Sequence, residues 1–139
     1  KDHPTSDRIY VFGPVEWEEL VKYTSSADIG VQQLQYRGPQ HYYALSNKLF
    51  EYLSAGLPVV CSDFPEIRKV VIENKVGLVV DETNPKKVAD AIIQILSNSK
   101  LYSEMSQNAK QVVEKKYNWE IEEEKLINIY RDLKSEFDI

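Results

Sequence analysis

The sequence predicts an α/β protein with a Rossmann-like parallel sheet and helices on its faces. Short apolar runs alternate with longer segments in which apolar residues recur every three or four positions, the pattern of repeated βα units. The run Ile9–Phe12 is continuously apolar, as in a strand that is buried on both faces of a parallel sheet. We expect residues 1–139 to form a single domain, because neither a repeat nor a linker divides them.

Two strands with a helix between them are expected in the first third of the chain. The apolar run Ile9–Phe12 ends at the pair Gly13-Pro14, and a helical pattern follows over 16–26. Four of its side chains fall near one face: Trp17, Leu20, Val21 and Thr24. The second strand is expected over 28–33. Residues 35–45 are polar and aromatic and indicate a loop, the kind of segment in which α/β proteins place their sites.

Capping residues mark the middle elements. Ser46 is the expected N-cap of a helix over 47–55, and Gly56 is its C-terminal stop. The sheet then continues with a strand at 57–62, a helix at 65–74 and a strand at 77–80.

Three helices make up the rest of the chain. Asn84 and Pro85 begin the first, which has a clean apolar stripe of Val88, Ala91, Ile92, Ile95 and Leu96. The second begins at Ser99 and carries on one face Leu101, Met105, Ala109 and Val112. Asn118 caps the last, which has an acidic first turn and an apolar stripe of Leu126, Tyr130, Leu133 and Phe137. Trp119 is expected to anchor this helix in the core.

Composition and charge exclude several classes of function. The net charge is −5 and the basic residues are scattered, which argues against a nucleic-acid-binding face. No apolar run reaches the length of a membrane span, and we expect a cytoplasmic protein. His3 and His41 stand far apart in the sequence, so no metal site is expected. No other cofactor is expected either, and His41, in a polar loop, should be solvated rather than catalytic. Cys61 is the single cysteine and is expected to be a small buried residue.

The topology predicts where a ligand should bind. Each parallel strand points its carboxyl end at the loop that follows it, and these loops meet at one edge of the sheet. The expected site therefore lies where four elements converge: Gly13, the loop over 35–45, Asp63 and Asp81.

The segment Ser46–Asp63 carries most of the functional argument. A phosphate can bind the positive end of the helix dipole through four backbone amides, those of Ser46, Asn47, Lys48 and Leu49. The Lys48 side chain could add a positive charge to the same anion. Glu51 lies one turn deeper, on roughly the same face as Lys48, where its carboxylate can accept both hydroxyls of a ribose. This spacing suits a nucleoside diphosphate. Alternatively, Lys48 and Glu51 form only a surface ion pair, and Gly56 only stops the helix.

Seven sequence blocks recur in the order known from one enzyme family. They are VFGPV at 11–15, SADIGV at 26–31, NKLFEYLSAGLPVV at 47–60, SDFPEIRKVV at 62–71, VGLVV at 76–80, NPKKVADAIIQIL at 84–96 and YNW at 117–119. In this order the chain resembles, almost from end to end, the C-terminal domain of family 4 glycosyltransferases of the GT-B fold. The resemblance implies a domain that binds a nucleotide-activated sugar for retaining transfer without a metal.

The resemblance also assigns candidate residues. Glu51 matches the second Glu of the family's Glu-x7-Glu pair, which holds the ribose, whereas Tyr43 stands where the first Glu should fall. Tyr43 then either replaces the sugar contact through its hydroxyl or only packs. Gly13 and Val15 match the family's wall for the nucleobase, and Glu66 matches a position near the donor. The alternatives are a simple turn glycine and a charge in the first turn of a helix.

Part of such an enzyme lies outside this sequence. In the family, two further βα units precede residue 9 and supply an Arg and a Lys that grip the pyrophosphate. An N-terminal domain binds the glycan or lipid-linked acceptor, and any contact with the inner membrane would come through it. We therefore expect this chain to bind a UDP-, GDP- or ADP-sugar in polysaccharide or glycoconjugate biosynthesis, and to lack transferase activity alone.

The truncation raises a question about the sheet edges. In the doubly wound order 3-2-1-4-5-6, the strand at 9–12 is the third and the strand at 28–33 is the fourth, so two absent strands would separate them. We expect the exposed edges to be covered by a dimer partner or by a different placement of the first strand.

Other classes of protein fit less well. A receiver-type signalling module would need an acidic pair beside one strand end, an Asp at another and a Lys at a third, whereas Asp28 here precedes its strand. The GxGxxG and GxxxxGK[ST] motifs of dehydrogenases and nucleotide hydrolases are absent. A non-catalytic glycosyltransferase subunit, in which Tyr43 marks lost sugar binding, remains open. The importance of Glu51 for nucleotide affinity would distinguish it.

Overall fold

The computed structural model describes residues 6–137, and its centre is a parallel sheet of three strands. The strands are β1 (Gly30–Gln32), β2 (Val59–Ser62) and β3 (Gly77–Val80), and they lie side by side in that order. Val60 is in register with Val31 on one side and with Leu78 on the other. This arrangement confirms the predicted Rossmann-like α/β class.

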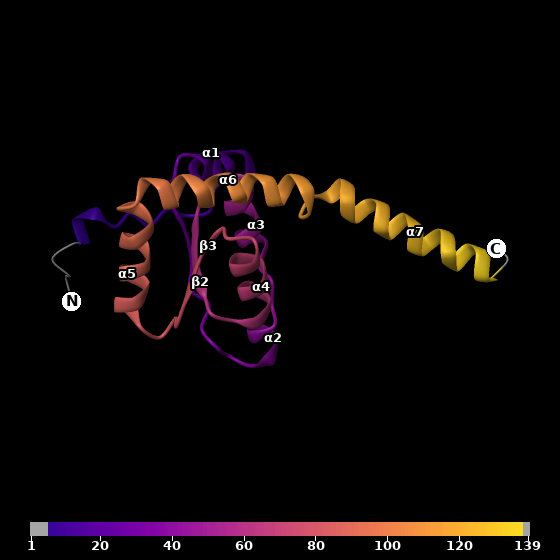
Figure 1. The fold of residues 1–139 in the computed structure, drawn as a ribbon, viewed down its shortest axis with the longest axis horizontal. Coiled ribbons are helices and arrows are strands. Elements are labelled where there is room, and N and C mark those ends of the chain that lie inside the picture. The colour runs from indigo at the N-terminus through magenta and orange to yellow at the C-terminus, as the bar shows by residue number, and fades with distance from the viewer. Residues whose placement is uncertain (1–5, 138–139) are drawn as a thin grey trace.

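Helices connect and cover the strands (Figure 1). They are α1 (Trp17–Ser25), α2 (Pro39–Tyr42), α3 (Asn47–Ser54), α4 (Pro65–Glu73), α5 (Pro85–Leu96), α6 (Ser99–Lys115) and α7 (Trp119–Phe137), after a short 3-10 turn η1 (Ser6–Arg8). The three predicted helices of the first half begin and end within one residue of these bounds. The four-residue α2 is an addition, because it lies inside the segment 35–45 that was expected to be a loop.

Different helices pack on the two faces of the sheet. Val59 and Cys61 of β2 pack in one cluster with α3 and α4, whereas Val60 packs in a second cluster with α5. Because parallel crossovers are right-handed and the strands are added in one direction, α3 and α4 share a face. α6 contributes to both clusters, and Figure 1 shows it lying across one end of the layers. The N-termini of α3 and α4 consequently lie at the carboxyl edge of the sheet.

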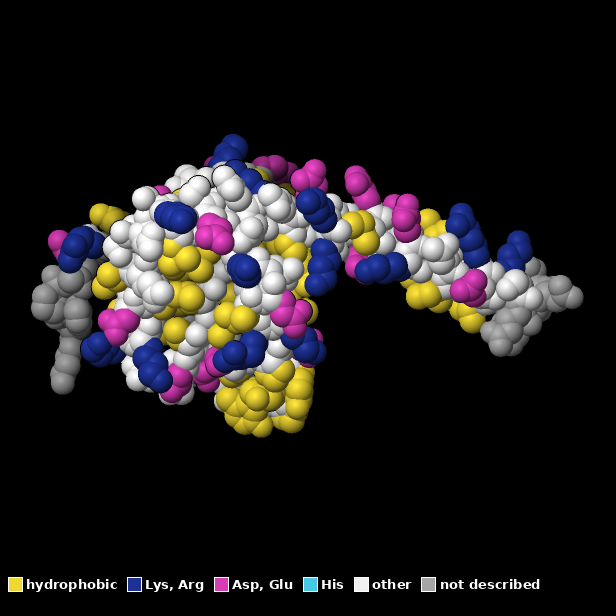
Figure 2. Space-filling view, in the orientation of Figure 1, with side chains coloured by type: hydrophobic (Ala, Val, Ile, Leu, Met, Phe, Trp, Pro, Cys, Tyr) yellow, Lys and Arg dark blue, Asp and Glu magenta, His cyan; other side chains and the backbone are white. Residues whose placement is uncertain are grey.

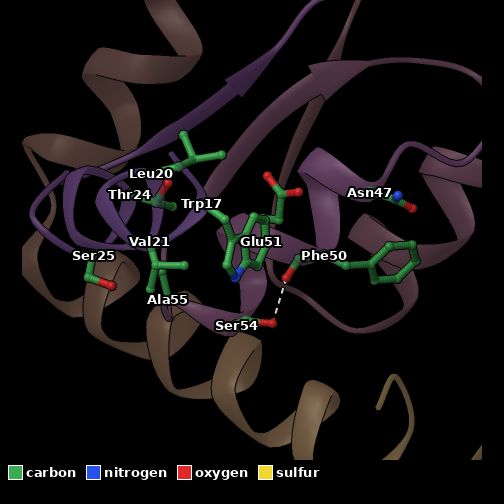
Figure 3. A pocket seen from close by; sticks show the side chains of 10 residues that line it. All are labelled: Trp17, Leu20, Val21, Thr24, Ser25, Asn47, Phe50, Glu51, Ser54 and Ala55. Atoms are coloured by element: carbon green, nitrogen blue, oxygen red, sulfur yellow. Dashed lines mark hydrogen bonds between the residues drawn. The ribbon is translucent and has the colours of Figure 1, made fainter. Parts of the chain in front are cut away.

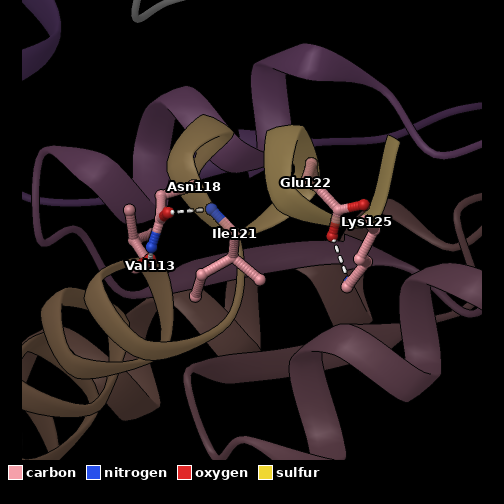
Figure 4. Close-up of polar contacts among 5 residues, drawn as sticks. All are labelled: Val113, Asn118, Ile121, Glu122 and Lys125. Carbon is pink, nitrogen blue, oxygen red and sulfur yellow. Dashed lines mark hydrogen bonds and ion pairs between the residues drawn. The ribbon is translucent and has the colours of Figure 1, made fainter. Parts of the chain in front are cut away.

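Side-chain caps confirm the predicted helix starts. The Ser46 hydroxyl accepts from the Lys48 amide at 3.2 Å, and the Asn84 amide oxygen accepts from the Lys87 amide at 3.1 Å. At α7, Asn118 accepts from the Ile121 amide at 3.0 Å, beside a Glu122–Lys125 ion pair (Figure 4). Gly56 has a φ of +73°, the left-handed conformation that glycine provides after a helix, so its predicted role as the stop of α3 is confirmed.

The predicted strand over Ile9–Phe12 is wrong. Residues 9–12 form no ladder, and their side chains are exposed, from 64% at Ile9 to 91% at Val11. A strand needs a neighbour for its backbone groups, and in the predicted order two strands would stand between this run and β1. The described residues contain neither of these strands, so residues 9–12 have no neighbouring strand with which to pair.

The predicted burial of the last helix is also wrong. α7 extends away from the body of the molecule (Figure 1), and Trp119 is 66% exposed rather than a core anchor. Its apolar stripe is exposed at three described positions: Leu126, Tyr130 and Leu133. The side chain of Phe137 lies outside what the structure describes, as does His3. The amphipathic pattern predicts an apolar face correctly, but no described element covers that face.

Candidate functional site

A pocket of about 460 Å³ lies between α1 and α3. Its wall on α1 is formed by Trp17, Leu20, Val21, Thr24 and Ser25, and its wall on α3 by Asn47, Phe50, Glu51, Ser54 and Ala55 (Figure 3). The α1 residues include the four that were predicted to share one face. That face therefore lines a pocket against α3 rather than filling the core.

Two of the predicted site residues, Glu51 and Asn47, line this pocket. Glu51 lies one turn below Asn47, so both side chains occupy the same face of α3. Opposite them, Trp17 comes from the first turn of α1 with 58% of its surface exposed. Figure 3 shows an indole and a carboxylate projecting from facing helices into one cavity. Trp17 was not predicted as a site residue, because a tryptophan on the apolar face of a helix has the pattern of a core residue.

The structure does not support the alternative in which Lys48 and Glu51 of α3 form a surface ion pair. Lys48 and Glu51 form no ion pair with each other, since Glu51 turns into the pocket and Lys48 is exposed outside it. An intrahelical pair between them was therefore a wrong alternative. Glu51 keeps its carboxylate available to a ligand.

The amides at the N-terminus of α3 differ in their availability. The Lys48 amide donates to the Ser46 hydroxyl, and the Leu49 amide donates to the Ser46 carbonyl at 3.1 Å. The expectation that all four amides are free is therefore wrong for these two, because the cap that begins the helix uses them. The amides of Ser46 and Asn47 have no partner within residues 6–137. Two amides and the helix dipole remain for an anion.

The expected convergence at the carboxyl edge is only partly present. Tyr42 of α2 packs on Phe64, with ring centroids 5.2 Å apart, so the segment 35–45 does meet the end of β2. Gly13 and Val15 are exposed and do not line the pocket, and a Cβ added at Gly13 would meet no atom within 4 Å. The predicted role of these two residues as a base-binding wall has no contact in the structure that supports it.

The acidic residues at the strand ends are engaged locally. Asp63 forms a bidentate ion pair with Arg68. Asp81 accepts from the hydroxyl of Thr83 at 2.6 Å and from its amide at 3.0 Å, and these hydrogen bonds lower the pKa of Asp81. Glu66, in the first turn of α4, pairs with Lys69 at 2.7 Å. Such exposed contacts contribute little to stability, and none of the three carboxylates lines the α1–α3 pocket.

Four buried polar side-chain atoms lack a hydrogen-bond partner among the described residues. They are both amide atoms of Gln32, which is 4% exposed, together with Gln33 Oε1 and His41 Nδ1. His41 on α2 is partly exposed, and only its Nδ1 atom is buried, so the prediction of a solvated ring holds for part of the side chain. Sequence reasoning missed Gln32, which occupies an inward-facing position of a strand where apolar residues are usual.

Burial disfavours ionisation of two side chains, Cys61 and Tyr52. Cys61 is fully buried in β2 as predicted, and burial raises the pKa of its thiol to about 12. Burial also raises the pKa of Tyr52. Within residues 6–137, no group of three His, Cys, Asp or Glu side chains is placed to hold a metal. None of the described helices has the length and apolar character that crossing a membrane requires.

Comparison with known proteins gives one family. The profile of the family described as Glycosyl transferases group 1 matches residues 1–112. The chain is 31% identical, over 84% of its length, to a D-inositol 3-phosphate glycosyltransferase of Corynebacterium urealyticum. It is 27% identical, over 94% of its length, to a GDP-mannose-dependent alpha-(1-6)-phosphatidylinositol monomannoside mannosyltransferase of Mycobacterium tuberculosis.

A third relative is an uncharacterized glycosyltransferase of Methanocaldococcus jannaschii, 26% identical over 80% of the chain. The matched region covers 26% of the Corynebacterium protein, 27% of the Methanocaldococcus protein and 34% of the Mycobacterium protein. The chain thus spans about a quarter to a third of the length of these relatives.

Proposed function

Because the chain belongs to the Glycosyl transferases group 1 family, we propose that it is the nucleotide-sugar-binding, C-terminal domain of a retaining family 4 glycosyltransferase. The parent enzyme would transfer a sugar from a UDP-, GDP- or ADP-sugar to a glycan or lipid-linked acceptor. The names of two relatives, an inositol phosphate glycosyltransferase and a phosphatidylinositol mannoside mannosyltransferase, support a role in polysaccharide or glycoconjugate biosynthesis.

One observation carries the proposal: Glu51 lines a pocket one turn from the capped N-terminus of α3. A ribose in this pocket can donate both hydroxyls to the Glu51 carboxylate. The attached diphosphate then reaches the amides of Ser46 and Asn47, where the helix dipole favours negative charge. The pocket volume of about 460 Å³ lies within the range of small-molecule sites.

Trp17 supplies the surface on which a base can stack. Its ring is exposed and faces the α3 wall, and a base–aromatic stack tolerates any base. The exposed loop with Gly13 and Val15 precedes α1, so it stays a candidate second wall that closes when the nucleotide binds. Tyr43 and Glu66 stay candidate sugar contacts, although neither lines this pocket.

The test is the affinity of the chain for UDP, GDP and ADP, measured by NMR titration. Removing Glu51 deletes two hydrogen bonds to a charged acceptor, so Glu51→Ala should weaken the preferred nucleotide about tenfold or more. Glu18→Ala is the matched control, because it removes the same charge from the outer side of α1. Equal affinity of the wild type and the Glu51 variant would refute the ribose role.

Activity needs the rest of the parent enzyme. We propose that residues 1–139 by themselves bind a donor without turnover, because they span only about a quarter to a third of the length of the related glycosyltransferases. Incubation of the purified chain with UDP-glucose or GDP-mannose and a saccharide acceptor should give no product. A measured turnover would show that the chain carries its own acceptor site and catalytic groups.

A further inference from the structure

Ser54 lies in the wall of the α1–α3 pocket, three residues beyond Glu51. Residues three or four apart on a helix share a face, so Asn47, Glu51 and Ser54 follow one another along the pocket side of α3. From the rise of an α-helix, Ser54 lies about 4.5 Å beyond Glu51 along the axis, and Asn47 lies about 6 Å before it. A nucleotide with its phosphates at Asn47 and its ribose at Glu51 therefore places its base at Ser54.

The hydroxyl of Ser54 is fixed as a hydrogen-bond acceptor towards the pocket. It donates its proton to the Phe50 carbonyl at 2.8 Å, the dashed line in Figure 3. A serine hydroxyl has one proton and two lone pairs, so only lone pairs remain for a ligand. The Ser54 side chain is exposed and lines the pocket, so a ligand can reach it. A ligand group that bonds to Ser54 must consequently be a donor, such as an N–H.

Charge and stacking do not distinguish one nucleoside diphosphate from another at this site. UDP, GDP and ADP each carry a diphosphate, and UDP and GDP carry the same ribose as ADP, while any base can stack on Trp17. Figure 2 shows Lys and Arg side chains interspersed with Asp and Glu on the described part of one face, so that surface presents no broad field of one sign. Selection between bases therefore depends on the hydrogen-bonding groups that line the pocket.

The position of Ser54 favours a uracil base. Uracil carries its ring N–H across a single ring from the ribose, whereas guanine carries its ring N–H across two fused rings and adenine has no ring N–H. Ala55, the next lining residue of α3, is the C-cap of the helix, so this wall ends one residue past Ser54. A single ring fits between Glu51 and this end better than two fused rings do.

The other polar groups of the pocket also suit uracil. The N–H of uracil lies between two carbonyl oxygens, and the lining hydroxyls of Thr24 and Ser25 on α1 can donate to such oxygens. Guanine presents two adjacent donors, its ring N–H and its amino group, which together match a carboxylate. Glu51 is the one carboxylate among the described residues that line the pocket, and the proposed function assigns it to the ribose. Guanine would thus leave a donor without a partner, which costs affinity.

Given the nucleotide site of the proposed function, on which this inference rests, we propose that Ser54 reads the base. Its hydroxyl oxygen accepts a hydrogen bond from the N3–H of uracil, and the donor of the parent enzyme is a UDP-sugar. Trp17 holds the face of the ring and Glu51 holds the ribose, while Ser54 supplies the directional contact that selects uracil.

The test compares UDP with 3-methyl-UDP, in which a methyl group replaces the N3 proton. In NMR titrations the wild type should bind UDP about tenfold more tightly than 3-methyl-UDP, because the methylated base cannot donate to Ser54. In Ser54→Ala the affinity for UDP should fall about fivefold, and the preference for UDP over 3-methyl-UDP should shrink to about twofold or less. The wild type should also bind UDP more tightly than GDP or ADP.

Ser135→Ala on α7 is the matched control. The Ser135 hydroxyl also donates to a backbone carbonyl, that of Asp132 at 2.8 Å, and it is exposed and does not line the pocket. This variant removes the same kind of hydrogen bond as Ser54→Ala and should keep the wild-type affinities for both probes. Circular dichroism verifies that each variant is folded.

Three results would overturn the role of Ser54 while the nucleotide site stands. One is binding that depends on Glu51 but is tighter for GDP or ADP than for UDP. Another is a preference for UDP over 3-methyl-UDP that is absent from the wild type or unchanged in Ser54→Ala. The third is an equal loss of UDP affinity in Ser135→Ala. If no nucleotide binds, or if binding does not depend on Glu51, the donor-site proposal is refuted and the role of Ser54 is refuted with it.

Discussion

Removal of the Ser46 cap tests how the start of α3 is built for an anion. In Ser46→Ala the Lys48 amide loses its 3.2 Å partner, and loss of such a cap costs about 1 kcal/mol. For a chain of this size, that loss lowers Tm by about 4 °C. The expected measurement is a thermal unfolding curve followed by circular dichroism.

The same variant should respond more strongly to a bound nucleotide. A diphosphate at the helix start can supply an oxygen to the Lys48 amide in place of the lost hydroxyl, so ligand should restore part of the missing stability. The preferred nucleoside diphosphate, when saturating, should therefore raise Tm more in Ser46→Ala than in the wild type. The difference reports whether the phosphate reaches this particular amide.

Asn98→Ala provides the matched control for the cap. Asn98 accepts from the Leu101 amide at 3.0 Å at the start of α6, away from the proposed site. It should lose a similar amount of stability and show the same nucleotide-induced rise as the wild type. If both variants respond alike to nucleotide, or if Ser46→Ala unfolds at the wild-type temperature, the reasoning about this helix start is refuted.

Three further outcomes follow from the local structure. Gly56→Ala should destabilise the fold by about 1 kcal/mol or more in urea titrations, because φ is +73° and the new Cβ would lie 2.3 Å from the Lys110 side chain; unchanged stability would contradict the left-handed stop. Burial raises the pKa of Cys61 from 9.0 to about 12, so the thiol ionises first in the unfolded chain. The protonated Cys61 thiol contributes fully to the free energy of unfolding below pH 9. Above pH 9 this free energy should fall by up to about 1.4 kcal/mol per pH unit, and the fall should be smaller in Cys61→Ala. Arg68→Ala breaks an exposed ion pair with Asp63 and should leave the free energy of unfolding almost unchanged; a clear loss in the same assay would contradict the exposed role.

The helices could be predicted from the sequence because their signals are local. Ser46, Asn84 and Asn118 each cap a helix in the structure, and each of these caps depends only on residues within the next turn. The strand at Gly77–Val80 was predicted with its observed bounds for a similar reason, since an apolar run stood between two clear breaks.

The errors arise where an apolar pattern needs a distant partner. Ile9–Phe12 and the stripe of α7 both have the composition of buried elements, yet in the described structure both are exposed. Periodicity reports which face is apolar, and it does not report what covers that face. The same limit hid Trp17, because a tryptophan in a helical stripe has the same pattern whether it fills a core or lines a pocket.

The candidate site was predictable in part. Glu51 was placed by its distance from the helix start, and the structure does turn it into a pocket. The availability of the amides was not predictable, because it depends on which groups the Ser46 cap has already engaged. Gly13 and Val15 follow a segment whose conformation depends on long-range pairing, so sequence alone did not fix their position.

The two tryptophans allow the most direct test of nucleotide binding between α1 and α3. Each gives one indole N–H signal in a ¹H–¹⁵N spectrum, Trp17 from the pocket wall and Trp119 from the exposed start of α7. A Trp119→Phe variant assigns the signals. Titration with the preferred nucleoside diphosphate should shift the Trp17 signal in a saturable manner and leave the Trp119 signal in place. A titration that shifts neither signal, or only that of Trp119, would contradict the proposal that the nucleotide binds in this pocket.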